Sequence, residues 1–249
     1  MKSKHVSVIT TFSFQSERPS ALQAVLATHR PRAAEVADTA RTLNWGSPLP
    51  AATSTAKRIM DIAGALVGLC MVAVLVLPIA IAIRHDSPGP LFFRQLRYGY
   101  RGKPFLIWKF RSMVSDADAN QHRVQNEARG LIFKNRADPR ITRVGRFLRR
   151  TSLDELPQFI NVLRGEMSLV GTRPPILNEV IQYQPHHWQR LAVKPGMTGK
   201  WQTSGRSSIE DFEDIVAMDM DYQSDWSIWK DLMMIFKTVA VVFGSKDAC

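Results

Sequence analysis

The sequence predicts a mostly helical α+β protein with one segment suited to a membrane. Ile62–Ile83 is a run of 22 residues without a charged side chain. Leu91–Arg97 and Phe105–Phe110 are short apolar segments separated by Gly99 and Gly102, a pattern typical of two strands joined by a turn. Most of the remaining chain has apolar residues at helical spacing in short blocks. A chain of 249 residues can bury one sizeable core, or one core together with a membrane element.

The first 55 residues are rich in Ala, Ser, Thr and Pro and have weak periodicity. We expect a flexible leader here, with one helix over residues 20–43. No apolar core lies near Met1, so a secretory signal is not indicated. The two cysteines, Cys70 and Cys249, give no disulfide framework.

The uncharged run can cross a membrane or enter and leave it on one side. A straight helix of this length reaches about 33 Å, which covers the ~30 Å hydrocarbon layer. Lys57, Arg58 and Arg84 flank both ends, however, and positive charge prefers the cytoplasmic side. Pro78 also interrupts helical hydrogen bonding within the run. The residues alone leave a spanning helix and a re-entrant hairpin equally open.

Three further helices are predicted after the strands. Arg143–Arg150 has apolar residues on one face and arginines around it, which suits a helix in the lipid head-group layer. Leu153–Leu163 follows, with Gly165 as its C-terminal cap. Trp226–Val239 is apolar and aromatic-rich, and its charges leave core packing and an interfacial position as alternatives.

The positive charge is concentrated in one part of the chain. The net charge is +11, and residues 84–173 contribute +10 of it, from 18 Lys and Arg against 8 Asp and Glu. Such a field attracts nucleic acid, acidic lipid or phosphorylated substrates. A solvated basic face explains the same count.

An adjacent acid pair, Asp154 and Glu155, lies within this basic stretch. Ser152-Leu153-Asp154-Glu155 reads as a capping box, which would give both acids a purely structural role. The neighbouring arginines are not explained by a cap. Arg149 precedes the pair and Arg173 follows the next glycine turn. Carboxylates that attack a phosphorus or bind a metal, beside guanidiniums that bind oxyanions, are chemistry suited to a phosphate.

Two other segments carry candidate anion ligands. Lys109 and Arg111 are two residues apart at the end of a strand, so they are expected to share its exposed face. Pro195–Arg206 is a loop punctuated by glycine that ends in Arg206; it lacks the order of a P-loop. No zinc motif is apparent, and the adjacent His186 and His187 are expected on the surface.

Several blocks together resemble the bacterial sugar transferases, the monotopic polyprenyl-phosphate phosphoglycosyl transferases that prime exopolysaccharide and glycan assembly. The resemblance covers about residues 56–245 and rests on blocks in family order: Lys57–Asp61, Lys109–Met113, Thr151–Gln158, Met167–Pro174, Pro195–Arg206 and Trp226–Thr238. It implies a leader over 1–55, a re-entrant membrane helix over 56–85, and a cytosolic phosphoglycosyl transferase domain over 86–249. Interfacial amphipathic helices would surround that domain.

The resemblance also implies a reaction and its site. Asp154 would attack the β-phosphate of a UDP-sugar, release UMP and form an aspartyl-phosphosugar intermediate. Undecaprenyl phosphate would then accept the sugar-1-phosphate. Mg²⁺ would offset the diphosphate charge at Asp154 and Glu155, with Glu155 also able to deprotonate the acceptor. The implied phosphate and substrate ligands are Lys109, Arg111, Arg149, Arg173 and Arg206.

The chain departs from the family at two places. The family's membrane helix bends at a Ser-Pro pair, whereas this chain has Leu77-Pro78, about one turn later. Thr172 stands where the family usually has Pro before an Arg-Pro pair. We expect a re-entrant helix because of the basic flanks. The leader carries none of the spans that precede this region in larger members, which indicates a minimal form.

The expected location is the cytoplasmic face of the bacterial inner membrane. The expected partners are a UDP-sugar, undecaprenyl phosphate and membrane lipids, with no nucleic acid; a homodimer is left open. Two other classes of protein remain as alternatives. One is a basic binding module on the membrane, and the other is a catalytically inactive scaffold of a polysaccharide assembly complex. The intact Asp154-Glu155 pair argues against both.

Overall fold

The computed structural model describes residues 20–118, 120–133, 135, 137–204, 209 and 211–244. Its helices and strands follow in chain order: α1 (Ala21–Thr28), α2 (Arg30–Thr42), α3 (Pro50–Thr53), α4 (Thr55–Asp86), β1 (Phe92–Tyr98), η1 (Tyr100–Gly102), β2 (Pro104–Phe110), η2 (Gln121–Arg123), α5 (Arg143–Arg150), η3 (Leu153–Gln158), α6 (Phe159–Arg164), β3 (Ser168–Val170), α7 (Leu177–Val180), η4 (His187–Ala192), β4 (Gly196–Thr198), α8 (Lys200–Thr203), α9 (Phe212–Ser224) and α10 (Ile228–Gly244). The mostly helical α+β class is confirmed.

The helix predicted over residues 20–43 is present as two helices. Ser20 and Gln23 form a capping box at the start of α1. Pro31 lies in the first turn of α2, where proline is tolerated because the amide it lacks would have no helical partner there. Val36 and Ala40 of α2 are buried against a core that includes Trp188. This part of the leader therefore packs on the domain, and residues 1–19 lie outside the described residues.

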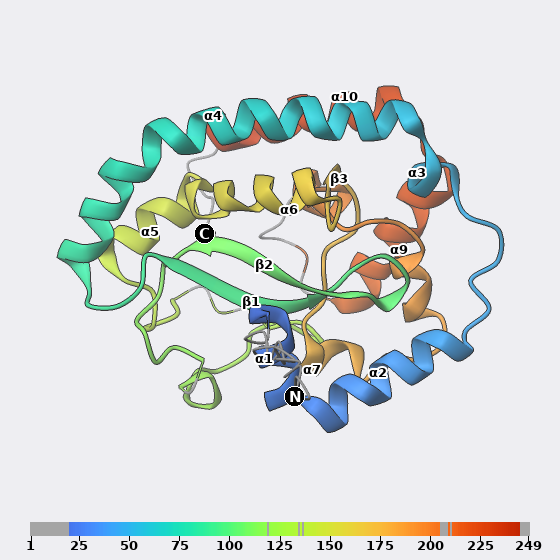
Figure 1. The fold of residues 1–249 in the computed structure, drawn as a ribbon, viewed down its shortest axis with the longest axis horizontal. Helices are drawn as coiled ribbons and strands as arrows, with labels where there is room; N and C mark the ends of the chain where they lie inside the picture. The colour runs from blue at the N-terminus through green and yellow to red at the C-terminus, as the bar shows by residue number, and fades with distance from the viewer. Residues whose placement is uncertain are drawn as a thin grey trace, which may run out of the picture.

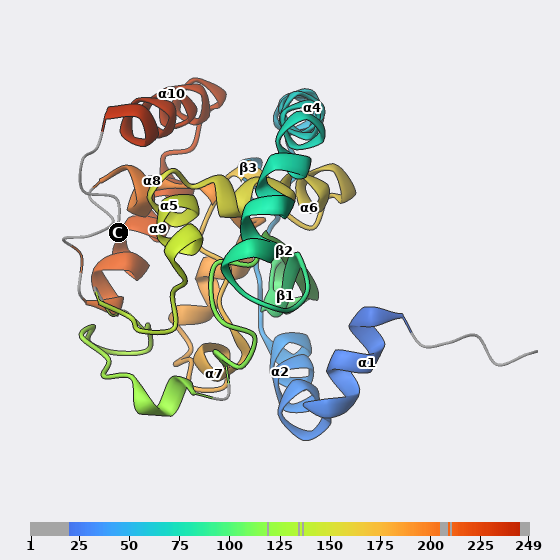
Figure 2. The ribbon, with the colours of Figure 1, turned by 90° about the vertical axis from the view of Figure 1, so that its left-hand side faces the viewer.

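The two predicted strands form an antiparallel hairpin whose register runs from Phe92 opposite Phe110 to Tyr98 opposite Pro104. Its turn places Arg101 and Gly102 at φ 53° and 71°, a left-handed conformation that glycine adopts without strain. The hairpin lies between α4 and α6 on one side and α2 on the other (Figure 2). η3, α6 and α7 pack against it.

A second, parallel pair joins β3 to β4. Here Gly171 and Gly196 approach so closely that a Cβ atom on Gly196 would lie 2.1 Å from the backbone nitrogen of Gly171. The Gly196 amide donates to Thr172 O over 2.9 Å, and the Gly171 amide donates to Thr198 O over the same distance. This contact fixes the backbone immediately before Arg173.

The long apolar helix α4 runs along one edge of the molecule (Figure 1). Ser54 caps its N-terminus by accepting from the Lys57 amide. Its inner face carries Gly64, Ala65 and Gly68, which let the helix approach Leu169 and Phe159 closely. Its outer face leaves large apolar side chains exposed: Ile59, Ile62, Leu66, Val67, Met71, Val74, Leu77 and Ile81. It is long and apolar enough to cross a membrane.

Both ends of α4 are fixed to the same folded domain. At the N-terminal end, Lys57 Nζ donates to Val170 O over 2.9 Å and pairs with the buried Asp231 of α10. Asp61 accepts from the Ser168 hydroxyl over 2.8 Å. At the C-terminal end, Asp86 accepts from the Val144 amide of α5 over 2.8 Å. The helix is therefore held against the domain along its length.

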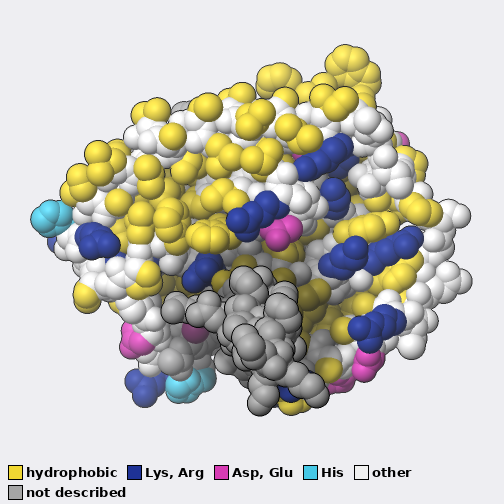
Figure 3. Space-filling model, in the orientation of Figure 1, with side chains coloured by type: hydrophobic (Ala, Val, Ile, Leu, Met, Phe, Trp, Pro, Cys, Tyr) yellow, Lys and Arg dark blue, Asp and Glu magenta, His cyan; other side chains and the backbone are white. Residues whose placement is uncertain are grey.

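The C-terminal helix α10 has two different faces. Met234 and Ile235 pack in a core cluster, whereas Trp229, Met233 and Phe236 are exposed. Both α4 and α10 run along the same edge of the molecule (Figures 1 and 2). Hydrophobic side chains cover that edge in the space-filling view (Figure 3). Core packing is therefore confirmed for one face of this helix, and the interfacial position stays a prediction for the other face, which is apolar and exposed.

Candidate active site

The acid pair lies at the junction of α5 and α6. Thr151 ends α5, and its hydroxyl donates to Phe147 O over 2.9 Å. Ser152 follows in a left-handed conformation, φ 54°, which turns the chain sharply into the 3₁₀ helix η3. A helix-capping side chain needs an extended backbone, so the predicted capping box is wrong: the Ser152 side chain makes no cap hydrogen bond. The helical continuation through α6 and the left-handed cap at Gly165 are confirmed.

Asp154 and Glu155 differ in their exposure and surroundings. Asp154 is buried, with 5% of its surface exposed. The Glu155 carboxylate accepts from Lys109 Nζ over 2.7 Å, and both side chains are about one-fifth exposed. This ion pair joins η3 to the end of β2. The structure thus brings Lys109 to the acid pair, and its role as a phosphate ligand stays a prediction.

Arg149 lies in the last turn of α5, one short turn before the pair. Its Nε donates to the Ser112 hydroxyl over 3.1 Å, and the side chain is partly buried. Ser112 belongs to the segment that follows β2, so Arg149 connects that segment to α5, and Lys109 connects the end of β2 to η3. Two of the predicted cationic ligands therefore lie at the same junction as the acids.

Arg111 has a different position from the one expected. It lies just beyond β2, is 5% exposed, and donates to the carbonyls of Pro88, Ser87 and Ile83 over 2.7, 2.6 and 3.4 Å. Burial lowers the pKa of its guanidinium, and the charge of Arg84 lowers it further. A cation at a helix C-terminus complements the helix dipole. The expectation that Arg111 shares an exposed face with Lys109 is therefore wrong, because its side chain holds the turn after α4.

Arg173 follows the Gly171–Gly196 contact and pairs with a buried acid. Its two Nη atoms donate to the two carboxylate oxygens of Glu179 over 2.7 and 2.9 Å. Burial raises the pKa of Glu179, but the attraction of Arg173 outweighs burial and leaves the pKa below its usual value. Beside this pair, Arg190 donates to Asp219 over 2.7 Å and to the Tyr183 hydroxyl over 2.8 Å. Arg173 is thus held in a buried charged cluster.

The sequence interpretation missed Arg97, which connects this cluster to the hairpin. Its Nη1 donates to Pro174 O over 2.8 Å, and its Nη2 donates to Gln95 Oε1 over 2.7 Å. Antiparallel pairing places Arg97, Gln95 and Lys109 on one face of the hairpin, because Phe93 is opposite Lys109. The alternation of Gln95 and Arg97 with buried Leu96 and Tyr98 was the available signal. Arg206, the last predicted ligand, lies outside the described residues.

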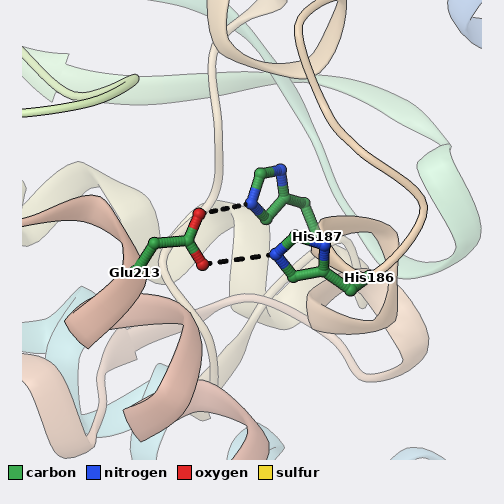
Figure 4. Close-up of side chains that lie close together, drawn as sticks. All are labelled: His186, His187 and Glu213. Carbon is green, nitrogen blue, oxygen red and sulfur yellow. Dashed lines mark hydrogen bonds and ion pairs between the residues drawn. The ribbon is translucent and has the colours of Figure 1, made fainter.

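A second group of titratable side chains lies away from the acid pair (Figure 4). His187 Nε2 is 2.8 Å from Glu213 Oε1, and His186 Nε2 is 3.2 Å from Glu213 Oε2. His187 is buried, so the expectation that both histidines are surface residues is wrong for it. The ligand atoms are close enough together for a metal ion.

The tautomer of His187 favours hydrogen bonding over metal binding. The Gln184 amide donates to His187 Nδ1 over 3.0 Å, so the proton of a neutral imidazole lies on Nε2. That Nε2–H donates to Glu213, and the two histidine bonds hold the pKa of Glu213 below its usual value. A metal ion on Nε2 would move the proton of the neutral imidazole to Nδ1. There it would face the amide proton of Gln184, and the hydrogen bond between them would be lost. This cluster therefore joins η4 to α9.

Taken together, these elements define a protein with a long apolar helix and, beneath it, an arginine-rich site around two adjacent carboxylates. The sequence pattern of the bacterial sugar transferase family matches residues 52–245. The chain belongs to this family.

Individual relatives support the same assignment. The galactosyl transferase CpsE of Streptococcus agalactiae serotype III is 49% identical over 189 residues, which cover 75% of this chain and 42% of the relative. The UDP-glucose:undecaprenyl-phosphate glucose-1-phosphate transferase of Escherichia coli is 41% identical over 211 residues, covering 82% and 44%. A protein of the same name from Caulobacter vibrioides is 39% identical over 215 residues, covering 83% and 77%. The chain spans less than half the length of the first two relatives.

Proposed function

We propose that this protein transfers a sugar-1-phosphate from a UDP-sugar to undecaprenyl phosphate, the first membrane step of exopolysaccharide or glycan assembly. The observation that carries the proposal is the buried Asp154 beside a Glu155–Lys109 ion pair, with Arg149 one turn away. Family membership and the activities for which the relatives are named support it. A low-dielectric site strengthens the interactions that stabilise charge on a phosphorus in transfer.

The chemistry proceeds in two displacements at one phosphorus atom. A carboxylate oxygen of Asp154 attacks the β-phosphorus of the UDP-sugar, the bond to the bridging oxygen breaks, and UMP leaves with that oxygen. A phosphate oxygen of undecaprenyl phosphate then attacks the same phosphorus. The bond to Asp154 breaks, which regenerates the carboxylate and yields the sugar linked through a diphosphate to the lipid. Lys109 and Arg149 hold phosphate oxygens in line for both steps.

Magnesium fits the acid pair by the chemistry of its donors. Mg²⁺ in proteins is commonly bound by one or two carboxylates together with substrate phosphates, and Asp154 and Glu155 supply such oxygens. When bound, the ion would offset negative charge on the diphosphate. Glu155 is held by Lys109, so this residue is already oriented in the structure.

The path of α4 supports a re-entrant or surface-embedded helix rather than a spanning one. Lys57 and Asp61 attach its beginning to β3 and α10, and Asp86 attaches its end to α5. A spanning helix would carry its two ends to opposite sides of the hydrocarbon layer. The exposed apolar faces of α4 and α10 suit the cytoplasmic leaflet of the inner membrane. The domain and its active site would then lie on the cytoplasmic face.

The test is nucleotide release from purified protein in nanodiscs, with Mg²⁺, undecaprenyl phosphate and a panel of UDP-sugars. We expect UMP with one donor, and loss of release in Asp154→Asn while membrane binding survives. Asp38→Asn, at an exposed acid of α2, is the matched control and should retain activity. Release of UDP would mean ordinary glycosyl transfer and overturn the mechanism. Release of neither nucleotide would favour the inactive scaffold.

A donor labelled at the β-phosphate tests the covalent step. Without acceptor, wild-type protein should retain the label after denaturation and lose it when undecaprenyl phosphate is added before denaturation. Asp154→Asn should retain none. Label that persists in Asp154→Asn would remove Asp154 as the nucleophile.

A further inference from the structure

We propose that Arg97 binds a phosphate group of the substrate through the Nε–Nη2 edge of its guanidinium. This inference rests on the proposed function, because it assigns a further substrate ligand to the same site. The resemblance to sugar transferases did not point to this residue. Its hydrogen bonds and surroundings in the structure do.

The guanidinium of Arg97 is anchored on one side and open to a partner on the other. Nη1 is held by Pro174 O at 2.8 Å. Nε is buried and has no hydrogen-bond partner. Nη2 donates only to the neutral amide oxygen of Gln95. Nε–H and Nη2–H point the same way from a planar guanidinium, and this pair of donors matches two oxygens of a phosphate.

The charge of Arg97 lacks the compensation that neighbouring cations have. Lys109 pairs with Glu155, Arg173 with Glu179 and Arg190 with Asp219. Among the described residues, no carboxylate forms an ion pair with Arg97. Burial lowers the pKa of Arg97 to about 10, and the charge of Arg173 adds to this effect. A partly buried charge without an ion-pair partner and a buried unsatisfied donor are both costly in free energy, and an incoming anion would relieve both.

Arg97 lies near both the acid pair and Arg173. Arg97 shares a face of the hairpin with Lys109, whose amine binds Glu155. The electrostatic influence of both Glu155 and Glu179 reaches Arg97. Its anchor, Pro174, directly follows Arg173 in the chain. A phosphate bound at the Nε–Nη2 edge would therefore lie on the side of the hairpin where Asp154 and Glu155 are held.

Gln95 occupies one of the two positions at Arg97 that phosphate oxygens would take. Its amide oxygen accepts from Nη2 in the absence of substrate, and the oxygen of an anionic phosphate is a stronger acceptor for a guanidinium than a neutral amide oxygen is. A phosphate oxygen can therefore displace Gln95 from Nη2 and gain Nε as well. Both the donor diphosphate and the acceptor phosphate have this chemistry, and binding measurements can separate them.

The experiment measures binding in the Asp154→Asn background, so that turnover is not needed. The affinities of UDP, UMP and undecaprenyl phosphate are compared in nanodiscs between Asp154→Asn alone and with Arg97→Gln added. Loss of one charge-assisted bidentate contact should weaken binding about 10- to 100-fold. A loss for UDP with little change for UMP assigns Arg97 to the β-phosphate of the donor. A loss for undecaprenyl phosphate alone assigns it to the acceptor.

Two further variants separate ligand binding from folding. Arg94→Gln is the matched control, since Arg94 is exposed on the opposite face of the same strand, over Trp108, and should change none of the affinities. Arg97→Lys keeps the charge without the paired donors, so it should recover part of the lost affinity and the full thermal stability. Unchanged affinity for all three ligands in Arg97→Gln and in Arg97→Lys would overturn the proposal. If wild-type protein still releases UMP, the proposed function is retained and only the role of Arg97 is rejected.

Discussion

Lys109 Nζ donates to the Glu155 carboxylate over 2.7 Å and thereby ties the central hairpin to the 3₁₀ helix that carries both acids. Both side chains of this ion pair are about one-fifth exposed, so water screens their attraction only in part. It orients Glu155 and places a cation beside Asp154. The contact therefore links the packing of β2 to the chemistry proposed for η3.

We expect Lys109→Gln to remove most UMP release, about 100-fold or more, with a smaller effect on folding. The reason is that the cation that would hold phosphate oxygens is lost, and Glu155 loses the partner that orients it. Because the pair is partly exposed, the cost to the free energy of unfolding should be about 1 kcal/mol. Initial rates and chemical denaturation of the same preparations provide the two measurements.

A double-mutant cycle checks that prediction. Lys109→Gln, Glu155→Gln and the double variant should show a coupling free energy of about 1 kcal/mol in stability. Additive stability effects would mean that the ion pair does not form in solution. Full activity in Lys109→Gln would remove this lysine from the site.

The buried pair of Arg173 and Glu179 predicts a specific dependence of stability on pH. The folded pKa of Glu179 is lowered, so its stabilising contribution is present above its unfolded value of 4.5 and is lost as the pH falls through the folded value. At neutral pH, Glu179→Gln should cost about 3 kcal/mol, because the mostly buried Arg173 guanidinium loses its ion-pair partner. The difference between wild type and Glu179→Gln should shrink steadily below about pH 4.5.

Denaturation of both proteins from pH 7 down to pH 3 measures this dependence. Glu35→Gln, at an exposed position of α2, serves as the control and should follow the wild-type curve. A difference that stays constant with pH would show that Glu179 contributes packing rather than charge.

Local patterns in the sequence were sufficient for the elements that local chemistry determines. Gly99 and Gly102 mark the hairpin turn, and Gly165 supplies the left-handed cap of α6. The alternation of apolar residues with arginines gave α5. The assignment of the acid pair and Lys109 to one phosphate site came from the resemblance to the family and stays a prediction; the structure places Lys109 against Glu155.

Tertiary contacts decided the features that sequence reasoning got wrong or missed. Arg111 is buried because the last turn of α4 and the residues after it present three carbonyls to it, and no local sequence pattern predicts this contact. Ser152 turns left-handed between two helices instead of capping one. Arg97 could be placed at the site only from its hydrogen bond to the carbonyl of Pro174, which is 77 positions away in the chain. His187 is buried by its contacts with a distant helix, α9.

Close packing of α4 on the domain depends on Gly68. A Cβ atom at this position would lie 2.3 Å from the Phe159 ring, so Gly68→Leu should push the helix away from α6. Because η3 and α6 are continuous in the chain, we expect lower thermal stability and at least tenfold slower UMP release. Val67→Leu, one position away with a side chain that is 64% exposed, should leave both unchanged. Equal behaviour of the two variants would mean that α4 does not pack on α6 as described.

The attachment of both ends of α4 to one domain predicts that both ends lie on the same side of the membrane. Single cysteines at Thr53 and His85, both exposed, can report this in a variant without the native Cys70 and Cys249. In intact cells a thiol reagent that cannot cross the inner membrane should label neither position. After the inner membrane is opened, it should label both. Because Lys57 binds Val170 and Asp86 binds the Val144 amide, a spanning helix would have to break one of these anchors. Labelling of Thr53→Cys alone in intact cells would therefore establish a spanning helix and show that the N-terminal anchor is released in the membrane.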